Sequence, residues 1–343
     1  MARSSSQAAL KAQLHRLWPD YQVIDATPLS GGLSNRCWRV TLQHSQTQTS
    51  AVQTCVWRPS SAASMAFGVN REQEYQLLAL LNQTVLHQTL LHETLSHQTL
   101  PHQTETSSAA PSSHSLTQRI SPAPFLYHQE GALVTWVDGE TAPDDLPMAT
   151  LLRVQAQIHA LPVPDWALDC RQRARHYWAY MAESDKTPAL TALYQHFQTV
   201  CTLPSQTETF PAACCHHDLG AYNLIHRLDG GYTVIDWEYA AAGDPSLDLA
   251  MTISANQWSP QSAVTVYCQQ RAQLGLDALA SPQTWLAAVQ AWLPWCDYLA
   301  MLWYYVALSN GITMTTACRL SGYNKSCYIR QCDPDSVTCS SLL

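Results

Sequence analysis

Two short segments on either side of a glycine-containing turn decide how this chain is interpreted. The first is HHDLGAYNLI (216–225), and the second is VIDWE (234–238). Between them stands Asp229-Gly230, a dipeptide typical of a tight turn that joins two antiparallel strands. The pattern therefore predicts a hairpin that carries acidic and amide side chains near its open end.

The register of this hairpin decides which polar side chains meet. If Asp229-Gly230 forms the loop, Asn223 lies opposite Asp236 with Cβ atoms about 5 Å apart, and their oxygens can share one Mg²⁺. If Gly230-Gly231 forms the loop, Asn223 lies opposite Glu238 instead. Asp218 precedes the first strand, where a base can take a proton from an attacking hydroxyl group.

Length and composition limit the classes of protein that the chain can belong to. With 343 residues, it has room for about two domains, or for two lobes of one fold, at about 150 residues each. Its 46% content of hydrophobic residues excludes a wholly disordered chain. The net charge of −8 argues against a nucleic-acid partner, which requires a basic surface.

The cysteines and the N-terminal segment indicate in which cellular compartment the protein resides. The sequence has 12 cysteines but no C-x-x-C pair, and Cys214 and Cys215 are adjacent, which is unfavourable for a disulfide bond between them. The first residues are polar and lead into a polar helix without the apolar core of a signal peptide. We therefore expect reduced thiols and a cytoplasmic protein.

The order of the expected elements predicts an α+β fold with two lobes. Segments rich in β-branched and aromatic residues precede and follow a helix that begins after Asn70. A break at 137–147 separates them from a mainly helical remainder, and a cleft between two lobes is the usual place for a ligand. The expected strands are 21–27, 37–42, 51–57, 125–127 and 133–137. The expected regions are a small β-rich N-terminal lobe (1–140), a larger helical lobe (141–310) and a tail of uncertain order (311–343).

Residues 82–118 are predicted to be a low-complexity surface insertion. Near-repeats such as LHQTL and LHETL recur every five residues, which matches neither one helix face nor strand alternation. His87, His92, His97 and His102 would therefore share no face, which disfavours the alternative of a metal site.

The apolar stretch 285–308 is long enough to span a bilayer. Gln290, Pro294 and Asp297 interrupt it, and no lysine or arginine flanks it closely. We therefore predict a buried helical hairpin here rather than a membrane span.

The motif H-x-D-x-x-x-x-N at 216–223, followed by IDWE at 235–238, resembles the aminoglycoside phosphotransferase and choline kinase superfamily. The resemblance is greatest to bacterial thiamine kinases and covers about residues 20 to 310, apart from the insertion. It implies a protein-kinase-like fold and a kinase that depends on ATP and Mg²⁺. The implied partner is a small, cationic substrate, with no nucleic acid and no membrane.

The resemblance implies a role for each matching position of the catalytic segments. Asp218 would be the catalytic base, and His216 would brace its loop. Asn223 and Asp236 would bind Mg²⁺. Behind them, Asp244 would cap a helix and Asp248 would support the catalytic loop.

A second group of positions would bind the nucleotide. The loop 29–35 resembles the family's phosphate loop, and Val56-Trp57-Arg58 stands where the family places its phosphate-binding residue. Glu74, rather than Glu72, would hold Arg58, and the hinge at 136–139 would receive adenine through its backbone. The implied nucleotide-binding residues are Ser30, Gly31, Gly32, Ser34, Asn35, Arg58, Glu74, Trp136 and Val137.

The acceptor is inferred from aromatic residues, although tryptophans at helical spacing are more often core residues than parts of a binding cage. An aromatic face attracts a permanent cation, and the chain has few carboxylates with which to bind a polycation. We therefore rank thiamine first, choline or ethanolamine second and aminoglycosides third; a catalytically inactive binding protein is the contrasting hypothesis. The candidate substrate residues are Trp237, Glu238, Trp295, Asp297 and Trp303.

Overall fold

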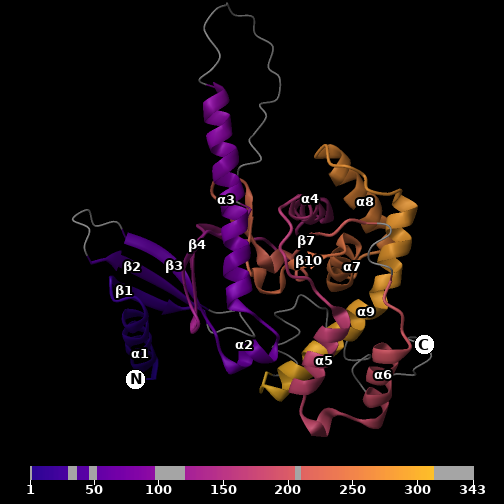
Figure 1. Cartoon of the computed structure of the whole chain (residues 1–343), viewed down its shortest axis with the longest axis horizontal. Helices are drawn as coiled ribbons and strands as arrows, with labels where there is room; N and C mark the ends of the chain where they lie inside the picture. Colours follow the sequence, from indigo (N-terminus) through magenta and orange to yellow (C-terminus); the bar gives the residue numbers. More distant parts are fainter. Residues whose placement is uncertain (1, 30–36, 46–51, 97–119, 205–209, 313–343) are drawn as a thin grey trace, which may run out of the picture.

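The computed structural model describes residues 2–29, 37–45, 52–96, 120–204 and 210–312. A β-sheet with helix α1 (Ala2–Leu17) lies at one side of the molecule, and the helices that follow residue 147 lie at the other (Figure 1). Helix α3 (Arg71–Ser96) stands between them. The chain thus has the predicted α+β composition, with strands gathered towards the N-terminus.

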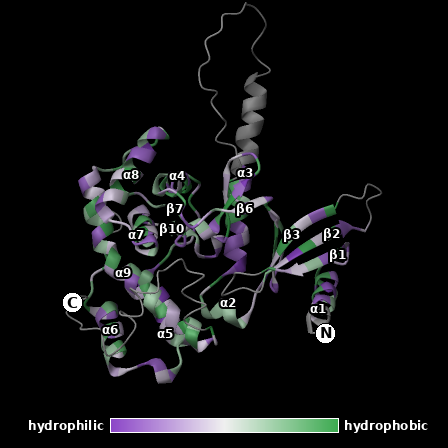
Figure 2. Ribbon diagram, turned by 180° about the vertical axis from the view of Figure 1, so that it is seen from behind, coloured by the Kyte–Doolittle hydropathy of each residue, from purple (hydrophilic) through white to green (hydrophobic). Residues whose placement is uncertain are grey.

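The N-terminal sheet is antiparallel and has the strand order β1-β2-β3-β5-β4. Its strands alternate between hydrophilic and hydrophobic residues along their length (Figure 2). The inward residues, such as Val40 and Leu42, pack with Leu10 and Leu14 of α1. All five strands lie where the sequence predicts them. They are β1 (Tyr21–Pro28), β2 (Trp38–His44), β3 (Val52–Pro59), β4 (Pro124–His128) and β5 (Gly131–Thr135).

Helix α3 follows the short helix α2 (Ala62–Ala66) and is capped as predicted. The side-chain oxygen of Asn70 accepts hydrogen bonds from the backbone nitrogens of Glu72 and Gln73, at 3.0 and 3.2 Å. The helix continues to Ser96, well into the segment that was expected to be an insertion. No glycine or proline occurs between Arg71 and Pro101, so no strong helix breaker interrupts the helix before Ser96.

The chain leaves the first sheet at Thr135 and enters a second sheet at Gly139. This second sheet has the order β6-β8-β9, from β6 (Gly139–Thr141), β8 (Leu224–Arg227) and β9 (Tyr232–Val234). A third pairing joins β7 (Ala213–Cys215) to β10 (Ala241–Gly243). These short strands carry or adjoin the segments 216–225 and 234–238, near the point where the chain crosses from the first sheet to the second.

The remaining helices build the largest hydrophobic core of the described chain, in which Trp285, Trp292 and Tyr267 are almost fully buried. They are α4 (Met148–Ile158), α5 (Cys170–Tyr180), α6 (Pro188–Thr199), α7 (Pro245–Asn256), α8 (Pro260–Gln273) and α9 (Pro282–Ser309). Single turns of 3-10 helix occur at η1 (Glu183–Asp185), η2 (Ala221–Asn223) and η3 (Trp237–Tyr239).

The predicted helical hairpin at 285–308 is wrong. Helix α9 runs without interruption from Pro282 to Ser309 and contains Pro294 in its interior. A proline removes only one backbone donor from a helix, and the packing of buried side chains on both sides of Pro294 holds this helix together. Within the described residues, no helix combines the length and apolar character needed to cross a membrane.

Candidate active site

The hairpin that carries the catalytic segments has neither of the two registers considered from the sequence. Leu224 pairs with Val234, so Asn223 lies opposite Ile235, whose backbone nitrogen donates to the Asn223 carbonyl at 2.9 Å. The loop has three residues, 228–230, and ends on Gly230 with a φ of +85°. A three-residue loop with a left-handed glycine is also a favoured hairpin connection.

Asp236 nevertheless reaches the same cavity as Asn223. It follows β9 directly and has a left-handed backbone, with φ 63° and ψ 55°, at the start of η3. Both residues line a cavity of about 650 Å³, together with Asp218 and Arg58. Strain of this kind in a residue other than glycine is often found where function requires a particular side-chain direction.

Asp218 lies on the loop that follows β7, beside the residues that lead into β8. Its Oδ1 accepts a hydrogen bond from the hydroxyl of Tyr222 at 2.8 Å, and its Oδ2 accepts one from the amide of Asn223 at 3.3 Å. Burial raises the pKa of Asp218 to about 8, and the nearby carboxylates of Asp236 and Glu238 add to this effect. The group therefore has a pKa in the range that suits a general base.

Tyr222 was not singled out from the sequence. Its position depends on Gly220, because a Cβ atom there would lie 2.2 Å from the ring of Tyr222. The available signal was the phenol placed four residues after Asp218, with a glycine between them.

Arg58 lies at the centre of a buried group of charges. Its Nε lies 2.9 Å from Glu74, and its Nη2 bonds to Asp236 and, at 2.9 Å, to Glu238. Glu72, the other candidate for its acidic partner, is exposed. Arg58 thus joins the N-terminal sheet to helix α3 and to the end of β9.

A second arginine, Arg71, belongs to the same group and was not foreseen. It contacts Glu74 and lies 3.1 Å from Glu238. Its spacing of three residues from Glu74 on one helix was the only sequence signal. Five buried or half-buried charges therefore pack together here, with three carboxylates against two guanidinium groups.

Glu238 and Trp237, both considered as substrate residues, face this network and the core. Burial and the adjacent Asp236 raise the pKa of Glu238 to about 7. Trp237 is almost completely buried, and its indole nitrogen donates to the carbonyl of Val234 at 2.8 Å. Both contribute atoms to the cavity wall, but their main contacts are with the protein.

His216 lies beneath the catalytic loop. Its Nε2 donates to the carbonyl of Ile235 at 3.1 Å, and its ring packs edge-on against Trp237, with centroids 5.0 Å apart. Burial lowers the pKa of His216, so the ring is neutral. It ties the loop that carries Asp218 to the strand end that carries Asp236.

Asp248 holds the same loop from behind. Its Oδ1 accepts from the backbone nitrogen of His217 at 2.6 Å, and its Oδ2 accepts from His159 at 2.8 Å and from Gln155 at 3.0 Å. Hydrogen bonds from His159 and Gln155, with Coulombic attraction to the His159 and His217 rings, hold the pKa of Asp248 well below its usual range despite burial.

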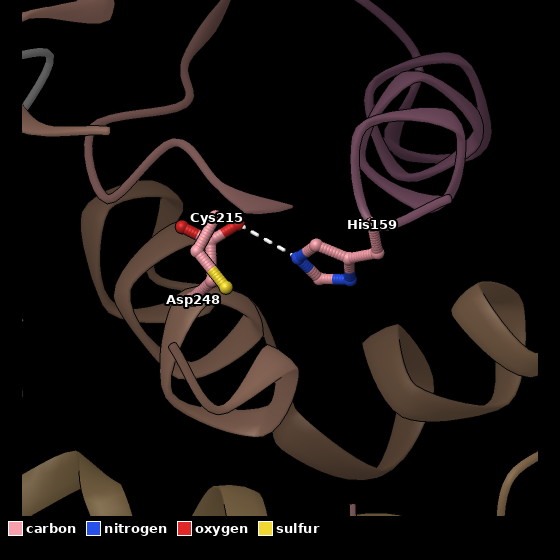
Figure 3. Close-up of side chains that lie close together, drawn as sticks. All are labelled: His159, Cys215 and Asp248. Atoms are coloured by element: carbon pink, nitrogen blue, oxygen red, sulfur yellow. Dashed lines mark hydrogen bonds and ion pairs between the residues drawn. The ribbon is translucent and has the colours of Figure 1, made fainter. Parts of the chain in front are cut away.

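Figure 3 shows His159, Cys215 and Asp248 close together. A ring nitrogen, the Sγ atom and a carboxylate oxygen of these residues lie within 4.8 Å of one another. These residue types can bind a metal, but His159 and Asp248 already bond to each other, and burial raises the pKa of the Cys215 thiol. Asp244, the remaining residue of this supporting set, caps α7 through Ser246 and accepts from Trp292 at 3.2 Å.

The structure brings only one of the three expected α9 residues to the cavity. Trp303 lines it, and its indole nitrogen donates to the hydroxyl of Tyr239 at 3.1 Å. Trp295 is buried against Phe197, and Asp297 bonds to Ser254, so neither faces the cavity. Tyr177 and Tyr239, which were not among the candidate substrate residues, line it instead.

Apart from Arg58 and Glu74, the residues expected to bind the nucleotide fall into two groups. Ser30, Gly31, Gly32, Ser34 and Asn35 lie outside the described residues. Trp136 and Val137 line the cavity beside apolar residues of both sheets, such as Val56 and Ile235. The backbone nitrogen of Trp136 donates to the carbonyl of Thr54 at 3.0 Å. The next backbone nitrogen, that of Val137, lies where the chain crosses from the first sheet to the second.

Comparisons with known proteins agree with this geometry. A model of the phosphotransferase enzyme family matches residues 25–285. A thiamine kinase from Shigella dysenteriae is 27% identical over 188 residues, which cover 54% of this chain and 63% of that protein. A thiamine kinase from Escherichia coli O157:H7 has the same identity and coverage. The chain thus matches less than two thirds of the length of these relatives.

Solved structures of low sequence identity share the fold. A choline kinase from Streptococcus pneumoniae is similar with a TM-score of 0.57 at 15% identity, covering 92% of this chain and 98% of its own. An ethanolamine kinase from Plasmodium vivax has a TM-score of 0.55 at 13% identity, covering 88% and 82%. The predicted kinase-like fold is thereby confirmed, and the family match spans most of the chain. The chain belongs to the phosphotransferase enzyme family.

Proposed function

We propose that this chain transfers the γ-phosphoryl group of ATP to the hydroxyl group of thiamine. The observation that carries the proposal is that Asp218, Asn223, Asp236 and Arg58 line one cavity although they come from separate segments. Phosphoryl transfer needs a base at the acceptor hydroxyl, oxygen ligands for a metal and a cation for the phosphates. These four side chains supply each of these groups.

The donor set at the proposed metal site fits Mg²⁺. Asp236 supplies a carboxylate oxygen, and Asn223 donates to Asp218 through its amide nitrogen, so that its amide oxygen is available as a ligand. When bound there, Mg²⁺ would neutralise charge on the phosphate oxygens. Arg58 contacts Asp236 in this structure, so it is placed to bind the same phosphates.

Asp218 would accept the proton of the acceptor hydroxyl as that oxygen attacks. Tyr222 and Asn223 hold the carboxylate by hydrogen bonds, and Asp248 and His216 fix the loop on which it stands. Adenine would lie between the apolar residues of the two sheets, near Trp136 and Val137. Such positioning would favour direct transfer to the hydroxyl oxygen, with ADP as the leaving group.

The aromatic wall of the cavity supports a flat or quaternary acceptor. Tyr177, Tyr239, Trp303 and Tyr304 line it, and aromatic rings bind cations such as thiazolium or choline. Apart from Asp218, the carboxylates of the described lining belong to the charge network around Arg58. A polycationic aminoglycoside would therefore find few acidic partners.

A panel of acceptors tests the proposal. Release of ADP from Mg·ATP is measured with thiamine, choline, ethanolamine, homoserine and kanamycin under the same conditions. We expect turnover with thiamine to exceed turnover with every other acceptor. Turnover with choline or ethanolamine alone would support phosphoryl transfer but identify a different acceptor. Binding of ATP without any turnover would favour an inactive binding protein.

The pH dependence tests the role of Asp218. A general base works only as a carboxylate, so kcat/KM should rise with pH along an acid limb, which bound Mg²⁺ would place below the pKa near 8 of the metal-free site. In Tyr222→Phe, the carboxylate loses a hydrogen bond that stabilises it, so its pKa should rise and the acid limb should move to higher pH by up to about one unit. A pH profile that is lowered uniformly, without moving, would contradict this role.

A further inference from the structure

An arginine lies among the aromatic residues of the cavity. Arg173, on α5, lines it, and its guanidinium carbon lies 5.2 Å from the ring centre of Tyr239 and 5.8 Å from that of Tyr177. Its Nη1 donates to the carbonyls of Phe67 and Gly68 at 3.2 and 3.3 Å. These contacts place a cation in the part of the cavity that would receive the acceptor.

Arg173 differs from the other two arginines of this cavity region. Arg58 and Arg71 are each paired with carboxylates, whereas within the described ranges Arg173 forms no ion pair with a carboxylate. Within the described residues its side chain contacts the rings of Tyr177 and Tyr239 and the two backbone carbonyls, and the hydroxyl of Tyr239 accepts from Trp303. A half-buried cation in such surroundings is stabilised by a ligand that offers a hydrogen-bond acceptor.

The charge of Arg173 also limits where a cationic group can lie. The carboxylates of Asp218 and Asp236 belong to the catalytic segments, whereas Arg173 lies with the aromatic rings. A permanent cation is attracted to the carboxylates and repelled by the guanidinium. An acceptor that fits both regions has its hydroxyl and positive charge near Asp218. Its other end, near Arg173, is a neutral ring that accepts a hydrogen bond.

We infer that Arg173 is a specificity-determining residue that donates a hydrogen bond to a ring nitrogen of a heteroaromatic acceptor. In thiamine this ring is the aminopyrimidine, which lies on the opposite side of the thiazolium from the hydroxyethyl group. The inference rests on the proposed function. It narrows the acceptor class to heteroaromatic alcohols with at most one permanent charge, and it separates thiamine from choline, which has no such ring.

The test compares thiamine with its benzyl analogue, in which a phenyl ring replaces the aminopyrimidine. The analogue keeps the thiazolium charge, the hydroxyl and a flat ring but lacks the ring nitrogens. We expect Arg173→Met to lower kcat/KM for thiamine by about 10- to 100-fold, through KM, with no loss for the analogue, whose thiazolium is no longer repelled by the guanidinium, and no change in the KM for ATP. Arg175→Met, on the same helix but exposed, is the matched control and should change neither substrate.

The outcomes separate the inference from the proposed function. Equal losses for thiamine and the analogue in Arg173→Met would mean that Arg173 only braces α5 against residues 67–68, and would overturn the inference. If the methionine variant does not fold, Arg173→Lys replaces it in the test, because lysine keeps the positive charge but lacks the planar guanidinium group. It should show the same selective loss for thiamine.

If the wild-type protein phosphorylates neither compound, the proposed function fails. In that case, thiamine binding is measured through the change in tryptophan fluorescence, and this measurement decides the role of Arg173. Selective loss of thiamine binding in the variant would support that role, and unchanged or absent binding would overturn it.

Discussion

Asp218→Asn is expected to lower kcat by about 10²- to 10⁴-fold, the usual contribution of a positioned general base. The variant keeps the shape of the side chain and loses the group that accepts the proton. Arg58, Asn223 and Asp236 remain, so the KM for Mg·ATP should change little. The measurement is steady-state ADP release at saturating acceptor.

Stability provides the control for this variant. Burial raises the pKa of Asp218 to about 8, above its value in the unfolded chain, so the folded protein favours the neutral carboxyl. As pH rises towards and through 8, the wild type should therefore lose stability relative to Asp218→Asn, which has no ionisable group there. Urea unfolding at neutral and alkaline pH checks the sign of this difference.

Asp165→Asn, at an exposed position, is the matched substitution and should leave both rate and stability unchanged. An Asp218→Asn protein that is folded and within tenfold of the wild-type rate would disprove the assignment of Asp218 as the base.

Arg58→Met is expected to lower the free energy of unfolding by about 3 to 5 kcal/mol, because it leaves partnered carboxylates buried without their main cation. Of the two guanidinium groups in this buried group of charges, only that of Arg71 would then remain to balance Glu74, Asp236 and Glu238. Urea unfolding followed by tryptophan fluorescence gives the difference. The same variant should also bind ATP more weakly, since Arg58 is the proposed phosphate contact.

A second substitution tests whether the loss comes from uncompensated charge. Adding Glu238→Gln to Arg58→Met removes one of the stranded carboxylates and should restore part of the stability, so the double variant departs from additivity. Arg153→Met, on the exposed face of α4, controls for loss of an arginine side chain. A loss below about 1 kcal/mol in Arg58→Met would place this group of charges among weakly coupled surface pairs.

The sequence alone predicted the order of the elements and the polar residues that we propose for catalysis. Runs of β-branched and aromatic residues located β1 to β5, because such side chains suit a pleated sheet whose one face packs on α1 and the core. Asn70 marked the start of α3, because a side-chain oxygen there caps free backbone donors. Short-range patterns of this kind depend on neighbours along the chain.

The tertiary structure decided what depends on contacts between distant segments. Two- and three-residue loops are both favourable for 228–231, so local preference left the register open, and the packing of Asn223 against Ile235 belongs to one register alone. Similarly, Trp295 and Trp303 stand on one helix, but only the position of α5 and η3 brings Trp303 to the cavity and buries Trp295.

Arg71 and Arg173 show the same limit. Each looks like an ordinary helical arginine in the sequence, and neither can be assigned until its neighbours are known. Arg71 meets Glu238 only because α3 packs against η3, and Arg173 reaches the cavity only because α5 packs beside the loop at 67–68. Local patterning predicted the strands and the polar residues proposed for catalysis, whereas long-range packing decided which charges are paired and which one lines the cavity among aromatic rings.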